Sequence, residues 1–183
     1  MAITASCRFL RDRFSPLKNL PAWGSSSWYG SWLRLNFGKP HLVFVESPKG
    51  TYARHKGARH VYVVGAHNFS LDMCRWRILD GKRRRFHSDQ SRMFLLRAGA
   101  FLEGRTLLGI ALAVRPLEFQ LRFEGDATLV VRPYKRAPHS DPLWHLYTGD
   151  QYLGLVAGRR LFYRRFSKSL LRSVAAAPVD VAF

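Results

Sequence analysis

The chain has 183 residues, of which 47% are apolar, so it can bury one ordinary hydrophobic core and is not expected to form several independent domains. Lysine and arginine number 30 against 12 acidic residues, which gives a formal charge of +18 and an isoelectric point near 11.0. Because such a surplus repels itself, it indicates an anionic partner: nucleic acid, an anionic membrane or an acidic protein. Cys7 and Cys74 are too few for a disulfide framework, and they indicate a reducing compartment.

Residues 1–14 form an amphipathic segment. Ile3, Cys7, Leu10 and Phe14 recur at helical spacing, and arginines occupy most of the other faces. An Arg-rich segment that contains Ser and only one acidic residue is typical of a mitochondrial transit peptide. An amphipathic anchoring helix is the alternative. The segment predicts a mitochondrial location, in the matrix or at the matrix face of the inner membrane.

Residues 15–40 combine Pro, Gly and Ser with large aromatic side chains, which predicts an irregular arm. A large apolar side chain gains roughly 1.5 to 3 kcal/mol by burial, so we expect the arm to pack along its own domain or along neighbouring protein subunits. The aromatic residues expected to make these contacts are Trp23, Trp28, Tyr29 and Trp32.

Residues 41–166 carry the β pattern. Four apolar runs are predicted to be strands: His41–Val45, Val61–Val64, Met93–Leu96 and Leu107–Leu112. The glycines after Met93–Leu96 favour a strand over a core helix there. The run from Leu107 to Val114 is far shorter than the roughly 20 residues that cross a bilayer, so we do not expect the chain to span a membrane by itself.

Two similar hairpins dominate this region, at Leu117–Val131 and Leu143–Val156. Each has alternating apolar residues and a Gly-Asp corner, Gly125-Asp126 in the first and Gly149-Asp150 in the second. We expect the two hairpins to share one sheet. The predicted fold is mainly β: a curved antiparallel sheet or small β barrel built from consecutive hairpins.

A short helix and tail are predicted over residues 167–183, with Leu170, Leu171 and Val174 on one side. Hairpin units from Val61 onward, followed by this apolar segment, resemble the tubby-C-like and scramblase-like barrels, in which repeated hairpins surround a hydrophobic C-terminal helix. The resemblance implies a lipid-binding or ligand-binding β barrel.

Two basic clusters are candidate contacts to RNA or to another anionic partner. The first follows the Asp80-Gly81 turn, and the second interleaves arginine with aromatic residues near the end of the β region. The residues are Lys82, Arg83, Arg84, Arg85, Arg159, Arg160, Arg164 and Arg165. A solvated loop is the alternative interpretation of the first cluster.

No set of residues predicts catalysis, a metal site or a cofactor. The seven histidines include close pairs at His55 with His60 and at His139 with His145, but neither pair has a third ligand at an established spacing. Phosphate-binding loops, dinucleotide fingerprints and nucleophile elbows are absent from the sequence. We therefore expect a non-enzymatic protein without a cofactor.

Three functional hypotheses follow. The leading one is a noncatalytic structural subunit of a large mitochondrial assembly, first a ribosome, whose Arg-rich loops contact rRNA. The second is a peripheral accessory subunit of an inner-membrane respiratory or ATP synthase complex, facing anionic phospholipid. The third is a lipid-binding barrel of the tubby-C-like type. The residue pattern leaves open RNA, lipid or acidic protein as the main partner.

Overall fold

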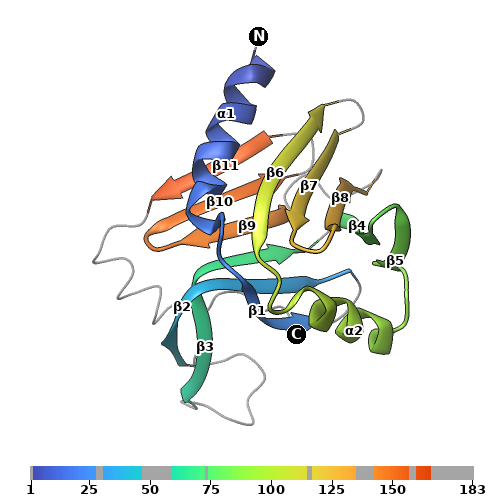
Figure 1. Cartoon of the computed structure of the whole chain (residues 1–183). Coiled ribbons are helices and arrows are strands. Elements are labelled where there is room, and N and C mark those ends of the chain that lie inside the picture. The colour runs from blue at the N-terminus through green and yellow to red at the C-terminus, as the bar shows by residue number, and fades with distance from the viewer. Residues whose placement is uncertain are drawn as a thin grey trace.

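The computed structural model describes residues 2–27, 31–46, 59–72, 74–114, 117–134, 142–156 and 160–165. Two α-helices, a short 3-10 helix (η1) and eleven strands make up these residues (Figure 1). In chain order they are α1 (Ala2–Phe14), η1 (Ser15–Leu17), β1 (Ala22–Ser27), β2 (Leu33–Glu46), β3 (Arg59–Leu71), β4 (Cys74–Asp80), β5 (Arg83–His87), α2 (Arg92–Leu102), β6 (Leu107–Val114), β7 (Leu117–Phe123), β8 (Ala127–Pro133), β9 (Pro142–Thr148), β10 (Gln151–Val156) and β11 (Arg160–Arg165).

The strands form two antiparallel sheets that pack face to face. One sheet has six strands in the order β1-β2-β3-β9-β10-β11, and the other has five in the order β5-β4-β8-β7-β6. The prediction of a mainly β, antiparallel fold is confirmed, but the sheets do not close into the small barrel that was its alternative. The predicted runs at His41, Val61 and Leu107 lie in β2, β3 and β6.

Both predicted hairpins form, but in different sheets. The turn of β7–β8 has positive φ at Gly125 and Asp126, and the turn of β9–β10 has positive φ at Gly149. The prediction that the two hairpins share a sheet is wrong, because β7–β8 belongs to the five-stranded sheet and β9–β10 to the six-stranded sheet. Each hairpin has one apolar face, and the two faces bury each other by packing together across the core. The rings of Phe119 and Trp144 stack there with their centroids 5.0 Å apart.

Helix α1 contributes to the core between the sheets. Leu10 and Phe14 are buried, and Leu17 of η1 is buried beside them. The Phe14 ring lies 5.2 Å from Phe119 and 5.7 Å from Trp144, so it contacts both sheets. The amphipathic helix predicted from the sequence therefore buries Leu10 and Phe14 of its apolar side inside this same domain.

The arm predicted as irregular contributes β1 and the start of β2. Ala22 pairs with Phe37 and Ser27 with Leu33, which makes β1 an edge strand of the six-stranded sheet. The indole of Trp23 donates to the carbonyl of Gly38 at 2.9 Å. Most of this segment therefore folds back onto its own sheet.

Helix α2 replaces the strand that was predicted at Met93–Leu96. Leu95, Ala98, Gly99 and Leu102 are buried at helical spacing, so the apolar run continues as one side of a helix. A Cβ atom at Gly99 would lie 2.5 Å from the Ser25 hydroxyl oxygen. The glycine that was taken as a helix breaker is therefore what lets α2 approach β1 closely.

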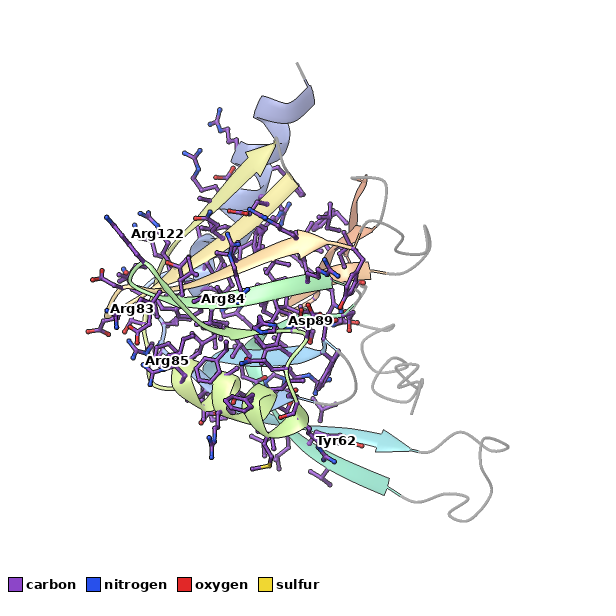
Figure 2. All side chains as sticks on the ribbon, turned by 90° about the vertical axis from the view of Figure 1, so that its right-hand side faces the viewer. Tyr62, Arg83, Arg84, Arg85, Asp89 and Arg122 are labelled. Carbon is purple, nitrogen blue, oxygen red and sulfur yellow. The ribbon has the colours of Figure 1, made fainter. Side chains whose placement is uncertain are left out.

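The β2–β3 hairpin continues beyond the body of its sheet. In the described residues β1 pairs with β2 only as far as Phe37, and β9 pairs with β3 only from His67 onward. A bulge on β2 lies between Phe37 and Pro40. Past it, the hairpin is a two-stranded ribbon that projects at the lower end of the molecule (Figures 1 and 2). The predicted C-terminal helix, residues 167–183, lies outside the described residues.

Candidate nucleic-acid interface

The outer face of the five-stranded sheet collects arginines from four strands. Trp76 and Ile78 of β4 point into the core, so the intervening positions point outward. Arg75 pairs with Arg132 of β8, and Leu79 lies between Arg84 of β5 and Thr128 of β8. Thr128 in turn pairs with Arg122 of β7. We name this surface the arginine face and define it as Arg75, Arg77, Arg84, Arg122 and Arg132.

One carboxylate, Glu118 of β7, lies within the arginine face. It is buried, and it accepts a hydrogen bond from Arg132 Nε and one from the amide of Gln120 at 2.5 Å. Arg77 places a terminal nitrogen 3.8 Å from the same carboxylate. Two of the five guanidinium groups, those of Arg77 and Arg132, thus contact this carboxylate. The excess of arginines leaves the face with a strong positive potential.

The arginines of this face are accessible. Arg75, Arg84, Arg122 and Arg132 are exposed, and the side chain of Arg77 is 39% exposed. Neighbouring strands lie about 4.8 Å apart and alternate residues along a strand about 7 Å apart, so the guanidinium groups form a two-dimensional array. Such an array can contact several anionic groups of one partner at once.

The predicted cluster at Lys82–Arg85 forms the β4–β5 turn and the start of β5. All four side chains are exposed, and Gly81 has the positive φ that this turn requires. Arg84 belongs to the arginine face. Figure 2 shows Arg83, Arg84 and Arg85 at the same side of the molecule as Arg122. The structure therefore joins this predicted cluster to a larger basic surface.

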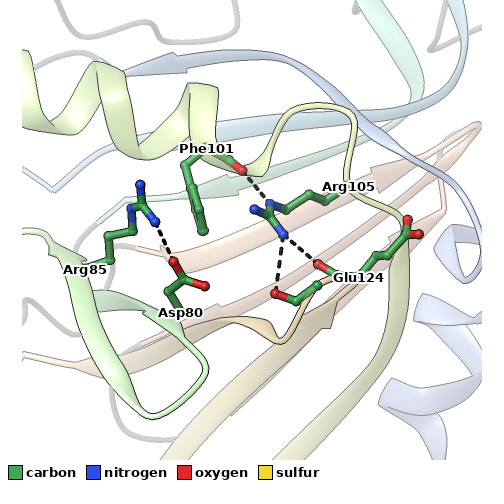
Figure 3. A network of polar contacts seen from close by, with 6 residues as sticks. Asp80, Arg85, Phe101, Arg105 and Glu124 are labelled. Atoms are coloured by element: carbon green, nitrogen blue, oxygen red, sulfur yellow. Dashed lines mark hydrogen bonds and ion pairs between the residues drawn. The ribbon is translucent and has the colours of Figure 1, made fainter.

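Arg85 has a structural role within that cluster. It forms an ion pair with Asp80, and its guanidinium lies 4.6 Å from the centre of the Phe101 ring (Figure 3). Arg105 lies 4.2 Å from the same ring and donates to the carbonyl oxygens of Phe101 and Glu124. The Phe101 ring of α2 thus contacts two arginines that tie the helix to the β4–β5 and β7–β8 turns.

The second predicted cluster lies elsewhere. Arg160 and Arg164 are in β11, at the edge of the six-stranded sheet, and Arg159 lies outside the described residues. Arg165 is exposed and donates from Nε to Asp150 at 2.7 Å, and this contact lowers the pKa of the Asp150 carboxyl. The structure does not bring the two predicted clusters onto one face (Figure 1).

The aromatic residues predicted to contact partners are only partly described. Trp23 and Trp32 are half-buried, and the Arg34 guanidinium lies 4.7 Å from the centre of the Trp32 ring. Trp28 and Tyr29 lie outside the described residues. Trp23 and Trp32 therefore have contacts within their own chain.

A polar cluster on the outer face of the six-stranded sheet was not predicted. His145 Nδ1 lies 2.8 Å from Asp72 Oδ2, and the His145 ring stacks on Tyr152 at 5.8 Å. Burial raises the pKa of Tyr147 and lowers that of Arg34, which lie in the same cluster. Ser70 pairs with His145 across the strands, but its hydroxyl is fully buried and donates to Asn68. The contacts of His145 with Asp72 and Tyr152 join neighbouring strands of the sheet. Because the Ser70 hydroxyl is buried, it is not an exposed nucleophile.

The described residues offer neither a metal site nor a membrane-spanning helix. They contain no group of three or more His, Cys, Asp or Glu side chains that could hold a metal ion. No helix among them is long and apolar enough to cross a membrane.

Burial, together with the charge of Asp72, raises the pKa of the Cys74 thiol, so this cysteine is a poor nucleophile.

Comparison of the chain with protein-family models, with curated proteins and with solved structures finds no match. The surface chemistry of the chain itself is therefore what indicates a function.

Four arginines of this face were not among the sequence candidates. Arg75 and Arg77 alternate with Trp76 and Ile78, and Arg122 lies between Leu121 and Phe123. This alternation could have indicated outward-facing strand positions. The order of the strands, which makes these positions neighbours, has no signal in the local sequence.

Proposed function

We propose that this protein is a noncatalytic structural component of a ribonucleoprotein assembly and that its arginine face binds RNA phosphates. The observation that carries the proposal is the gathering of five arginines on one sheet face, where one buried carboxylate, Glu118, contacts two of them. Arginine offers a planar fork of donors that matches phosphate geometry. A mitochondrial ribosome remains the leading candidate for the assembly, and the basis for that location is the pattern of residues 1–14.

Polarity favours RNA over lipid at this face. Among the described residues, none of the exposed large apolar side chains occupies a sheet position that pairs with one of the five arginines. Interfaces with nucleic acid are more polar and more positively charged than interfaces between proteins. The Arg75 guanidinium also lies 5.5 Å from the centre of the Tyr134 ring. Unpaired RNA bases stack on guanidinium planes and on aromatic rings, so this pair suits a single-stranded RNA segment.

The test is binding of the full chain to a structured RNA with single-stranded loops, measured across a salt series. The variant Arg84→Gln with Arg122→Gln removes two exposed charges from one row of the face. Each phosphate contact contributes about 0.7 to 0.9 to the slope of log K against log salt, so the slope should become shallower by about 1.4 to 1.8.

The matched control is Arg8→Gln with Arg11→Gln, which removes the same charge from exposed positions on α1. We expect this variant to retain the salt slope of the unaltered chain. Equal losses of slope in the two variants would show that RNA responds only to the overall charge, and they would refute the assignment to the arginine face.

A further inference from the structure

A second surface has the opposite character. Nine large apolar side chains are exposed in the described residues, and seven of them belong to α2 or to the projecting β2–β3 ribbon. These seven are Leu42, Val61, Tyr62, Val63, Met93, Phe94 and Leu96, and we name them the apolar end. Their exposed fractions run from 42% to 61%. Both elements lie at the lower end of the molecule in Figures 1 and 2, and Tyr62 marks the ribbon in Figure 2.

The ribbon presents an apolar face without a covering layer from the described part of its own chain. Leu42 pairs with Val63, so these side chains point to one face, and Val61 follows two residues along on that same face. This face continues the side on which Phe37 and Phe69 are buried in the body of the sheet. A lone two-stranded hairpin is marginally stable in water, so contact with an apolar environment would stabilise the ribbon.

Helix α2 is apolar on two sides. Leu95, Ala98 and Leu102 are buried against the protein, whereas Met93, Phe94 and Leu96 are exposed. Exposed arginines flank the outer group at both ends, and the Arg97 guanidinium lies 5.7 Å from the centre of the Phe94 ring. Apolar side chains bordered by cations are typical of helices that lie in the interface of an anionic membrane.

The net positive charge of the residues around the apolar end favours an anionic partner over a second copy of this chain. Helix α2 contains no acidic residue, the ribbon strands contain one, Glu46, which pairs with Arg59, and Lys39 is exposed on the ribbon. A second copy of this chain would bring like charge to the same place, because the chain carries +18.

We propose that the apolar end docks on the surface of an anionic lipid bilayer, with its apolar side chains in the interfacial region and its basic residues at the phosphate head groups. Insertion of the apolar side chains about 5 to 10 Å into the bilayer interface contributes the part of the binding free energy that salt does not screen. The flanking cations give the part that anionic lipid strengthens. The inference is independent of the RNA proposal, since the two surfaces share no residue.

The test measures binding of the full chain to phosphatidylcholine vesicles with and without cardiolipin, at about 0.1 M and about 1 M salt, where the Debye length falls from about 10 Å to about 3 Å. Two variants keep the local backbone preference: Met93→Gln with Leu96→Gln in the helix, and Leu42→Thr with Val63→Thr in the ribbon. Leu108→Thr, at an apolar position of β6 that is 48% exposed, is the control.

We expect cardiolipin to strengthen binding at low salt and a part of the binding to remain at high salt. Each double variant should weaken that remaining part by about tenfold, and Leu108→Thr should not. Arg84→Gln with Arg122→Gln should weaken RNA binding while leaving the high-salt vesicle binding unchanged, so failure of one proposal can be told from failure of the other.

Complete loss of vesicle binding at high salt would overturn the proposal, because only diffuse charge attraction would then remain. Double variants that bind vesicles as the unaltered chain does would overturn it as well. A concentration-dependent dimer by light scattering that both double variants abolish would instead assign the apolar end to self-association.

Discussion

Replacing Phe14 by alanine should destabilise the fold by about 3 to 5 kcal/mol, the range observed for Phe-to-Ala changes in protein cores. The side chain is 1% exposed, so almost all of its apolar surface loses contact with the protein interior. Its ring contacts Phe69, Phe119 and Trp144 at centroid distances of 5.8, 5.2 and 5.7 Å, and the substitution would leave a cavity between them.

Urea unfolding of the full chain, followed by tryptophan fluorescence, measures this loss. With an m value of about 2 to 3 kcal/mol per M, the midpoint should fall by about 1 to 2.5 M. Since domains are stable by only about 5 to 15 kcal/mol, the variant should remain folded but marginal. Phe94→Ala provides the matched control, because Phe94 is 44% exposed and its replacement should cost less than about 1 kcal/mol.

An unchanged midpoint and m value for Phe14→Ala would refute the reasoning, because they would show that α1 does not pack between the sheets. The same measurement on a chain without residues 1–14 tests the helix as a whole. Removal of both Leu10 and Phe14 should prevent cooperative unfolding, so a chain cleaved after residue 14 would not keep this core intact.

Two further predictions concern packing and ionisation. Gly99→Ala should destabilise the protein although alanine favours helix by about 1 kcal/mol, because the new Cβ would lie 2.8 Å from Ser25 Cβ, and a Gly99→Ala with Ser25→Gly variant should recover stability in a double-mutant cycle. A more stable Gly99→Ala single variant would contradict the close approach of α2 to β1. Burial, with the charges of Tyr147 and Asp72, raises the pKa of Tyr152 to about 12. The folded chain therefore holds this proton more tightly than the unfolded chain, so the free energy of unfolding should fall as pH rises from about 10 to about 12. Tyr152→Phe should make that decline shallower in urea titrations, and identical declines in both chains would count against the shift.

Local patterns predicted the elements better than their arrangement. The Gly-Asp corners at Gly125 and Gly149 identify both hairpins, because positive φ at a tight turn requires such residues. Which sheet receives each hairpin depends on how apolar faces pair across the core. That pairing is set by contacts such as Phe119 with Trp144, which no local period encodes.

The error at α2 has a similar origin. The prediction weighed Gly99 as a residue that disfavours helix, as intrinsic propensity indicates. In the structure the missing side chain is what allows the helix to contact Ser25, so tertiary packing overrides propensity. For the candidate site, Arg84 was predicted because it lies in a basic run, whereas Arg75, Arg122 and Arg132 become its neighbours only through strand order.

The position of α1 also constrains when folding can finish. Phe14 is synthesised more than a hundred residues before its partners Phe119 and Trp144. Contacts between residues so distant in sequence form slowly, because loop closure must precede them. Until then the Arg-rich helix has no sheet to cover its apolar side. During that interval Leu10 and Phe14 are open to other apolar partners, and they complete the core only once β7 and β9 have formed.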